Sequence, residues 1–66
     1  MNNWIKILNE KSIESKTLKE SEILINIPIE FIEKWDNFMR GKTCPILDNG
    51  EYGVYSWDLQ QFLNNT

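Results

Sequence analysis

Histidine is absent from this sequence of 66 residues, and Cys44 is the only cysteine. A structural zinc site needs several His or Cys ligands, so one chain of this composition cannot build one. A single cysteine also rules out an internal disulfide. The N-terminal residues 1–11 have neither the long apolar stretch nor the small-residue cleavage site of a secretory signal. Together these features predict a cytoplasmic protein.

Long apolar runs are missing as well. No stretch approaches the roughly 18 apolar residues that cross a bilayer, so we expect no membrane association. Apolar residues still make up 41% of the chain, including three Trp, three Phe and two Tyr, which is enough for a folded core. We expect one small domain over residues 1–66. Because its core is small, homo-oligomerisation is a common supplement to stability and stays open here.

The chain also lacks an excess of positive charge. Seven Lys and Arg stand against ten Asp and Glu, giving a net charge of −3. Attraction to phosphate dominates nucleic-acid affinity, so this balance argues against nucleic-acid binding and is compatible with a basic protein partner. The alternative is a small single-stranded nucleic-acid binder. It would use Lys34, Arg40 and Lys42 with stacking on Tyr52 and Tyr55.

The clearest element is a helix over about residues 28–40. Pro28 suits a first helical position, and Gly41 suits the left-handed residue after the last turn. Between them lies an apolar stripe of helical spacing, formed by Phe31, Ile32, Trp35, Phe38 and Met39. A second helix is predicted over about 57–64, where Leu59, Phe62 and Leu63 share one face.

A β-hairpin is predicted over residues 44–55. Asn49-Gly50 is typical of a two-residue type I′ turn. That turn would place Leu47 opposite Tyr52 and Cys44 opposite Tyr55. Pro45 has no N–H to donate, which indicates an edge strand.

The N-terminal half is less clearly patterned. Residues 4–8 favour a strand, with a helix as the main alternative, and the alternating isoleucines of 23–27 predict another strand. The polar segment 9–22 is expected to be a loop or weakly ordered. The predicted fold class is therefore α+β, a short antiparallel sheet that includes the 44–55 hairpin and is covered by the two helices at 28–40 and 57–64.

The tripeptide Gly41-Lys42-Thr43 resembles the end of a phosphate-binding loop, but its context is wrong. The pattern requires a glycine five residues before Gly41, where this chain has Asp36, and the loop must open a helix rather than end one. Residues 48–51 likewise lack the spacing of a calcium loop. We therefore predict no metal and no cofactor.

Catalysis is not expected either. Without histidine, nucleophilic catalysis has no obvious base, and a chain of this size has little room for a substrate pocket. Because the chain has no histidine to lower the pKa of its thiol, Cys44 is expected to be a small, half-buried residue rather than a reactive thiol. We predict no catalytic residues and a protein that is not an enzyme.

Protein recognition is the function class that remains. Interfaces are enriched in Trp and Tyr, and three rings of the C-terminal half are not needed to fill either helix face. The predicted surface combines these rings with neighbouring acids: Tyr52, Tyr55 and Trp57, rimmed by Asp48, Glu51 and Asp58. It would suit a basic protein partner or self-association. By analogy with other short acidic domains, inhibitor, antitoxin, immunity or accessory-factor roles are expected.

Overall fold

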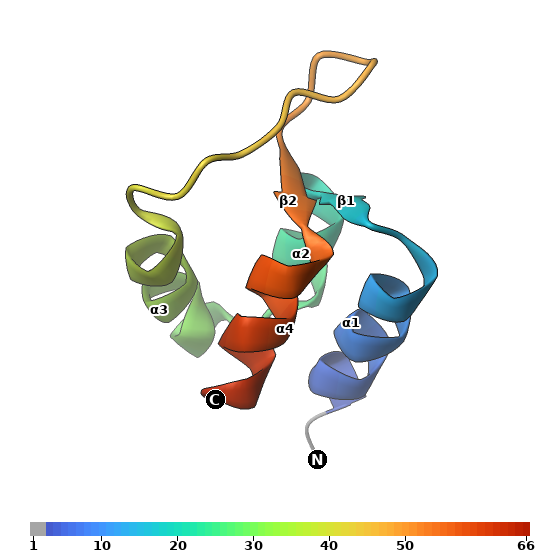
Figure 1. Ribbon diagram of the computed structural model, residues 1–66. Helices are drawn as coiled ribbons and strands as arrows, with labels where there is room; N and C mark the ends of the chain where they lie inside the picture. The colour runs from blue at the N-terminus through green and yellow to red at the C-terminus, as the bar shows by residue number, and fades with distance from the viewer. Residues whose placement is uncertain (1–2) are drawn as a thin grey trace.

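The computed structural model describes residues 3–66. Over that range the chain forms four helices and two short strands, which run in the order α1 (Asn3–Glu14), β1 (Thr17–Lys19), α2 (Glu20–Asn26), α3 (Ile29–Met39), β2 (Gly53–Tyr55) and α4 (Ser56–Asn64). The helices lie below the sheet in Figure 1, and the loop between α3 and β2 projects beyond it. The predicted α+β class is confirmed.

The two strands pair antiparallel, so that β1, from the N-terminal half, meets β2 just before the last helix. Leu18 lies opposite Val54, and both side chains are buried in the core. Thr17 lies opposite Tyr55 on the other face. This alternation follows from the two-residue period of a strand, and it leaves one face of the sheet outside the core.

The hydrophobic core draws on all the helices and both strands. Leu8, Ile23, Val54 and Leu59 have no exposed surface, and they come from α1, α2, β2 and α4. The other buried apolar residues are Trp4, Leu18, Ile27, Trp35, Met39, Phe62 and Leu63. Trp57 and both tyrosines are therefore outside the core cluster.

Residues 4–8 belong to α1, so the strand favoured for this segment is wrong and its helical alternative is correct. The buried face consists of Trp4, Leu8 and Ser12, which are spaced four residues apart. The hydroxyl of Ser12 donates a hydrogen bond of 2.7 Å to the carbonyl of Asn9 and accepts one from Gln60 of α4. The strand-like alternation of Ile5 and Ile7 was a weaker signal than this four-residue spacing.

The predicted strand over 23–27 is also wrong, because this segment lies in α2 and at its C-terminal cap. Ile23 and Ile27 are buried, whereas Ile25 between them is 81% exposed. A strand would place all three on one face, but a helix places only residues four apart together. Glu20 and Glu22 in the first turn favour this helix through its dipole, and Pro28 ends it.

Residues 9–22 are not a loop. They contain the end of α1, the whole of β1 and the first turn of α2. Their polarity reflects exposed helix faces, since Leu18 and Ser12 are the buried positions of the segment. Two isolated buried residues gave too little periodicity for the elements to be recognised.

The two predicted C-terminal-half helices are confirmed as α3 and α4, within one residue at each end. Gly41 has a φ of 84°, the left-handed conformation expected after a helix. The Lys42 N–H donates to the Met39 carbonyl at 3.1 Å. Trp35 and Met39 of the apolar stripe are buried, and its other members pack at the edge of the core.

Only the tip of the predicted 44–55 hairpin forms, and its register differs by one residue from the prediction. Residues 44–47 are not a strand, and Tyr55 pairs with Thr17 of β1 rather than with Cys44. Ile46, not Leu47, pairs with Tyr52. The Gly50 N–H donates to the Leu47 carbonyl at 2.9 Å, and the Leu47 N–H donates to the Glu51 carbonyl at 2.8 Å. Among residues 47–51 only Gly50 has a positive φ, 86°, which excludes a type I′ turn and fits a three-residue loop with a bulge at the glycine.

Among residues 3–66 no helix combines the length and the apolar character needed to cross a membrane.

Candidate functional site

Tyr55 and Trp57 form a parallel aromatic stack at the junction of β2 and α4. Their ring centroids are 4.4 Å apart and the ring planes differ by 8°. Tyr55 is half-buried, whereas Trp57 is 60% exposed. The stack forms because Tyr55 points to the outer face of the sheet and Trp57 lies in the first turn of α4. The most exposed tryptophan of the described residues thus rests against a neighbouring ring.

A shallow depression of about 570 Å³ adjoins this stack. Tyr55 of β2 and Lys19 of β1 line it from the sheet, and Pro45, Ile46 and Asp48 line it from the hairpin loop. Ile46 is 62% exposed. We call the stack and this depression the aromatic face. Of the six predicted residues, Asp48, Tyr55 and Trp57 belong to it.

Tyr52 and Glu51 lie elsewhere. Tyr52 is 61% exposed, and it lines a separate depression of about 260 Å³ with Glu51 and with Leu24 of α2. Successive strand residues point to opposite faces, so residues 52 and 55 cannot share one. This spacing was readable in the sequence, and the expectation that both tyrosines share one patch is wrong.

Two of the three acids in the predicted rim lie close to lysine side chains. The carboxylate of Asp58 lies 3.8 Å from the ammonium group of Lys42, and its side chain is only 13% exposed. The carboxylate of Glu51 lies 3.9 Å from the ammonium group of Lys19. Asp48 remains as the acid that lines the aromatic face. This face is therefore more aromatic than acidic.

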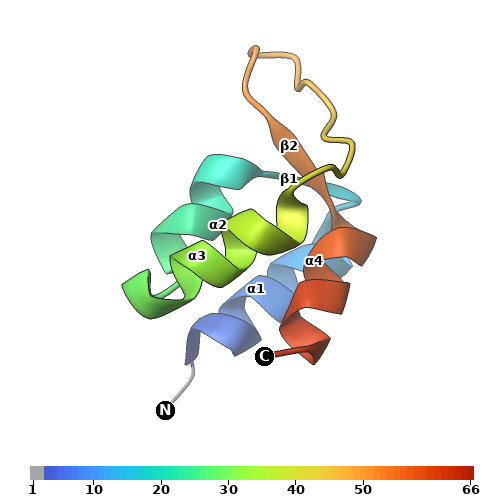
Figure 2. The same ribbon diagram turned by 90° about the vertical axis from the view of Figure 1, so that its left-hand side faces the viewer.

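The negative charge gathers instead at a groove that the sequence did not reveal, between α2 and α3. Its apolar residues are Leu24, Ile29, Ile32 and Trp35. Its charged residues are all acids: Glu20, Glu33 and Asp36. Figure 2 shows α2 and α3 adjacent on the side facing the viewer. The groove was missed because Leu24 was assigned to a strand.

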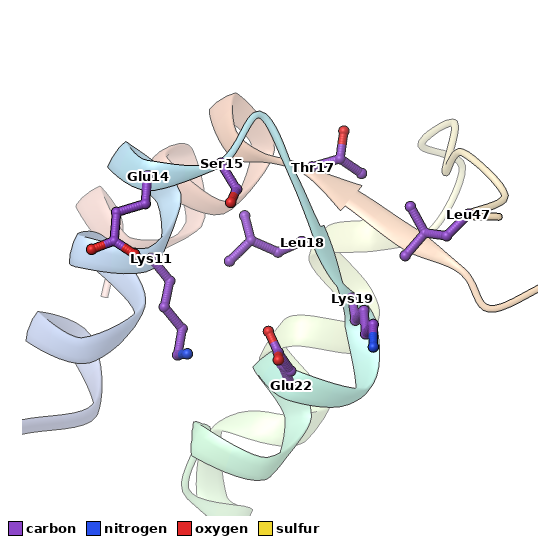
Figure 3. A pocket seen from close by; sticks show the side chains of 8 residues that line it. All are labelled: Lys11, Glu14, Ser15, Thr17, Leu18, Lys19, Glu22 and Leu47. Atoms are coloured by element: carbon purple, nitrogen blue, oxygen red, sulfur yellow. The ribbon is translucent and has the colours of Figure 1, made fainter. Parts of the chain in front are cut away.

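Another depression, of about 280 Å³, lies where α1, β1 and α2 meet. Figure 3 shows Leu18 pointing into the space between the helices, with charged side chains around it: Lys11, Glu14, Lys19 and Glu22. Two lysines and two glutamates balance, so this depression has no preference for a ligand of either charge.

The three cations of the nucleic-acid alternative are engaged along α3 and just after it. The Lys34 ammonium group lies over the ring of Phe31, 5.3 Å from its centroid. Arg40 lies 3.4 Å from Asp36, and Lys42 is close to Asp58. None of these three cations lines the depressions next to the tyrosines. These three cations therefore share neither depression with the tyrosines, which the alternative requires.

Cys44 lies half-buried at the edge of the core. Burial raises the pKa of its thiol, and the carboxylates of Glu20 and Asp58 raise it further. The thiolate is the reactive form, so a raised pKa lowers reactivity at neutral pH. The expected unreactive role is consistent with this environment.

This environment predicts slow alkylation of Cys44. Iodoacetamide at pH 7.5 should modify the folded protein several-fold more slowly than the same protein in urea, because unfolding removes both burial and the nearby carboxylates. The rate for the folded protein should keep rising with pH after that for the unfolded protein levels off. Quenched time points measured by mass spectrometry would give both rates, and equal rates would contradict the prediction.

Among residues 3–66 no three His, Cys, Asp or Glu side chains are grouped so that they could hold a metal ion. Comparison with known protein families, with characterised proteins and with solved structures finds no match. Function must therefore be inferred from the surfaces described above.

Proposed function

We propose that this chain is a non-enzymatic protein-interaction module that binds a protein partner through the aromatic face. The observation that supports the proposal is the stacked and exposed pair of Tyr55 and Trp57. Tryptophan and tyrosine dominate the residues that contribute most to protein–protein binding. Trp57 is not needed for the core, which is filled by other residues.

The stack also lowers the cost of binding. A free tryptophan side chain loses rotamer freedom when a partner covers it, at about 0.5–1.5 kcal/mol per side chain. Trp57 already rests against Tyr55 before any partner arrives. The adjoining depression, with exposed Ile46 beside it, offers a partner apolar surface next to the ring. A preorganised anchor beside an apolar hollow is the usual centre of an interface.

The charge of the chain indicates which class of protein partner is favoured. Asp48 and Lys19 both line the aromatic face, so its local charges balance, and the preference rests on the net charge of −3 of the whole chain. A basic protein surface is therefore the favoured partner, and long-range attraction would speed its association. Inhibitor, antitoxin, immunity and accessory roles are the types of function that such binding would serve.

Replacing Trp57 with alanine should weaken the complex without unfolding the chain. An anchor residue contributes about 2 kcal/mol or more, so affinity should fall roughly 30-fold. The wild-type chain and the variant would be used to capture proteins from native lysate, with quantification by mass spectrometry. Thermal unfolding followed by circular dichroism would establish that both chains are folded.

The matched control is Gln61→Ala, an exposed position on the same helix. It should retain the partner as the wild type does. If Trp57→Ala is folded and retains the partner equally well, the aromatic face is not the binding site. If the variant unfolds, the ring supports the fold, and the proposal that it is a free anchor is wrong.

A further inference from the structure

The groove between α2 and α3 is another surface of residues 3–66 with room for a ligand. It encloses about 540 Å³. Ile29 is 87% exposed and Leu24 is 38% exposed, and both line it. Ile29 is the first residue of α3, directly after Pro28, so its exposure follows from the sharp turn between the helices. The groove thus presents apolar side chains that the fold does not cover.

The charges around the groove have one sign. Glu20 comes from the start of α2, and Glu33 and Asp36 come from the exposed side of α3. Of these three acids, Asp36 has a basic side chain nearby within residues 3–66. Its carboxylate lies 3.4 Å from the guanidinium group of Arg40, and both side chains are largely exposed. Opposite charges across an interface select the partner and orient it. The occupant should therefore be apolar at its centre and basic at its edges.

A second copy of this chain fits the groove poorly. In a two-fold symmetric dimer the same surface meets itself, so the carboxylates of both copies would face each other. Like charges brought together in this way oppose binding. The net charge of −3 adds a further repulsion between copies.

We propose that this groove binds a basic amphipathic segment of a protein partner. The segment would place apolar side chains between Leu24 and Ile29 and its Lys or Arg residues against the carboxylates of Glu20 and Glu33. Helix-in-groove recognition of this kind uses apolar anchors at spacings of i, i+3, i+4 and i+7. The groove is separate from the aromatic face, so the two surfaces can be tested independently.

The test uses a synthetic peptide of about 16 residues, long enough to form a helix in water. It carries Leu at i, i+3, i+4 and i+7, Lys at four of the outward positions and Ala elsewhere, because like charges four residues apart would oppose the helix. Binding is measured by anisotropy of a fluorescent label on the peptide. The wild-type chain should bind it, and binding should weaken as salt is raised, because the charges are exposed. The same peptide with Glu in place of Lys should not bind.

Two pairs of variants locate the site. Ile29→Ser should weaken binding of the basic peptide by about fivefold or more, as loss of an interface anchor does. Ile13→Ser, at an Ile that is 75% exposed on α1, should leave binding unchanged. Glu33→Gln should weaken binding about two- to threefold, the size expected of an exposed ion pair. Glu10→Gln on α1 should have no effect. Trp57→Ala should also have none, which separates this proposal from the aromatic face.

Equal losses at the groove and control positions would overturn the proposal, because they would indicate unspecific attraction of a cation to an acidic protein. Light scattering provides the second check. A wild-type dimer that Ile29→Ser converts to a monomer would assign the groove to a second copy instead.

Discussion

Leu59→Ala should leave the chain largely unfolded at 25 °C. Leu59 has no exposed surface and comes from the middle of α4, where the helix packs on the rest of the core. Truncating a buried leucine to alanine costs about 2–5 kcal/mol, because a cavity remains where the side chain was. A single core in a chain below about 70–80 residues rarely supplies more than about 3–5 kcal/mol. One such cavity therefore removes most of the stability.

The measurement is a urea titration followed by far-ultraviolet circular dichroism. Leu59→Met keeps the volume and should cost less than about 1.5 kcal/mol. Gln61→Ala, an exposed change on the same helix, should stay within about 0.5 kcal/mol of the wild type. A Leu59→Ala midpoint close to those of the two controls would show that the core can collapse around the loss, or that self-association supplies the missing stability.

Local signals in the sequence were sufficient where both ends of an element were marked. Pro28 and Gly41 bracket α3, and the apolar spacing between them has a helical period. The prediction therefore agreed with the structure within one residue at each end. Agreement of the start signal, the stop signal and the period is what made this element readable.

The same signals failed over residues 23–27. β-branched residues and an alternating pattern favour a strand, and both are present there. What decides the outcome is tertiary packing, because Ile23 and Ile27 reach the core together only from a helix. The helical alternative requires Ile25 to be exposed, a cost that composition alone does not reveal. Assigning residues 23–27 to a strand also hid the groove, because Leu24 lines it together with α3 only when its segment is helical.

The six predicted site residues were also only partly readable from the sequence. The sequence could indicate that Tyr55 and Trp57 are spare rings, because α4 has an apolar face without them. It could also have placed Tyr52 on the opposite face from Tyr55, since they are three residues apart along an extended segment. It could not show that Lys19 and Lys42 lie near Glu51 and Asp58, because each of these pairs joins segments separated along the chain.

Trp35→Ala should also unfold the chain, whereas Trp35→Phe should not. Trp35 is 2% exposed, and its ring meets that of Phe62 edge-on, with centroids 5.1 Å apart. Removing a buried tryptophan costs about 3–5 kcal/mol, and the lost aromatic pair adds about 0.5–1.5 kcal/mol. Together these losses reach or exceed the roughly 3–5 kcal/mol that a core of this size supplies.

Trp35→Phe should cost less stability than Trp35→Ala because it removes the indole N–H of Trp35. No protein atom of residues 3–66 accepts a hydrogen bond from this buried group, and a buried donor without a partner costs about 1–3 kcal/mol. Trp35→Phe removes that cost and keeps an aromatic ring against Phe62, which offsets the lost volume. We expect a net destabilisation below about 1.5 kcal/mol, measured by urea titration with circular dichroism.

A Trp35→Phe variant as unstable as Trp35→Ala would show that the indole N–H has a partner, such as an ordered water, whose loss matters. The folded variant has a further use, because Trp35 also lines the groove between α2 and α3. If the groove binds the basic amphipathic peptide through its apolar residues, Trp35→Phe should keep most of that affinity. It should also lose any change in tryptophan fluorescence that the peptide causes through Trp35, which ties the bound peptide to this groove.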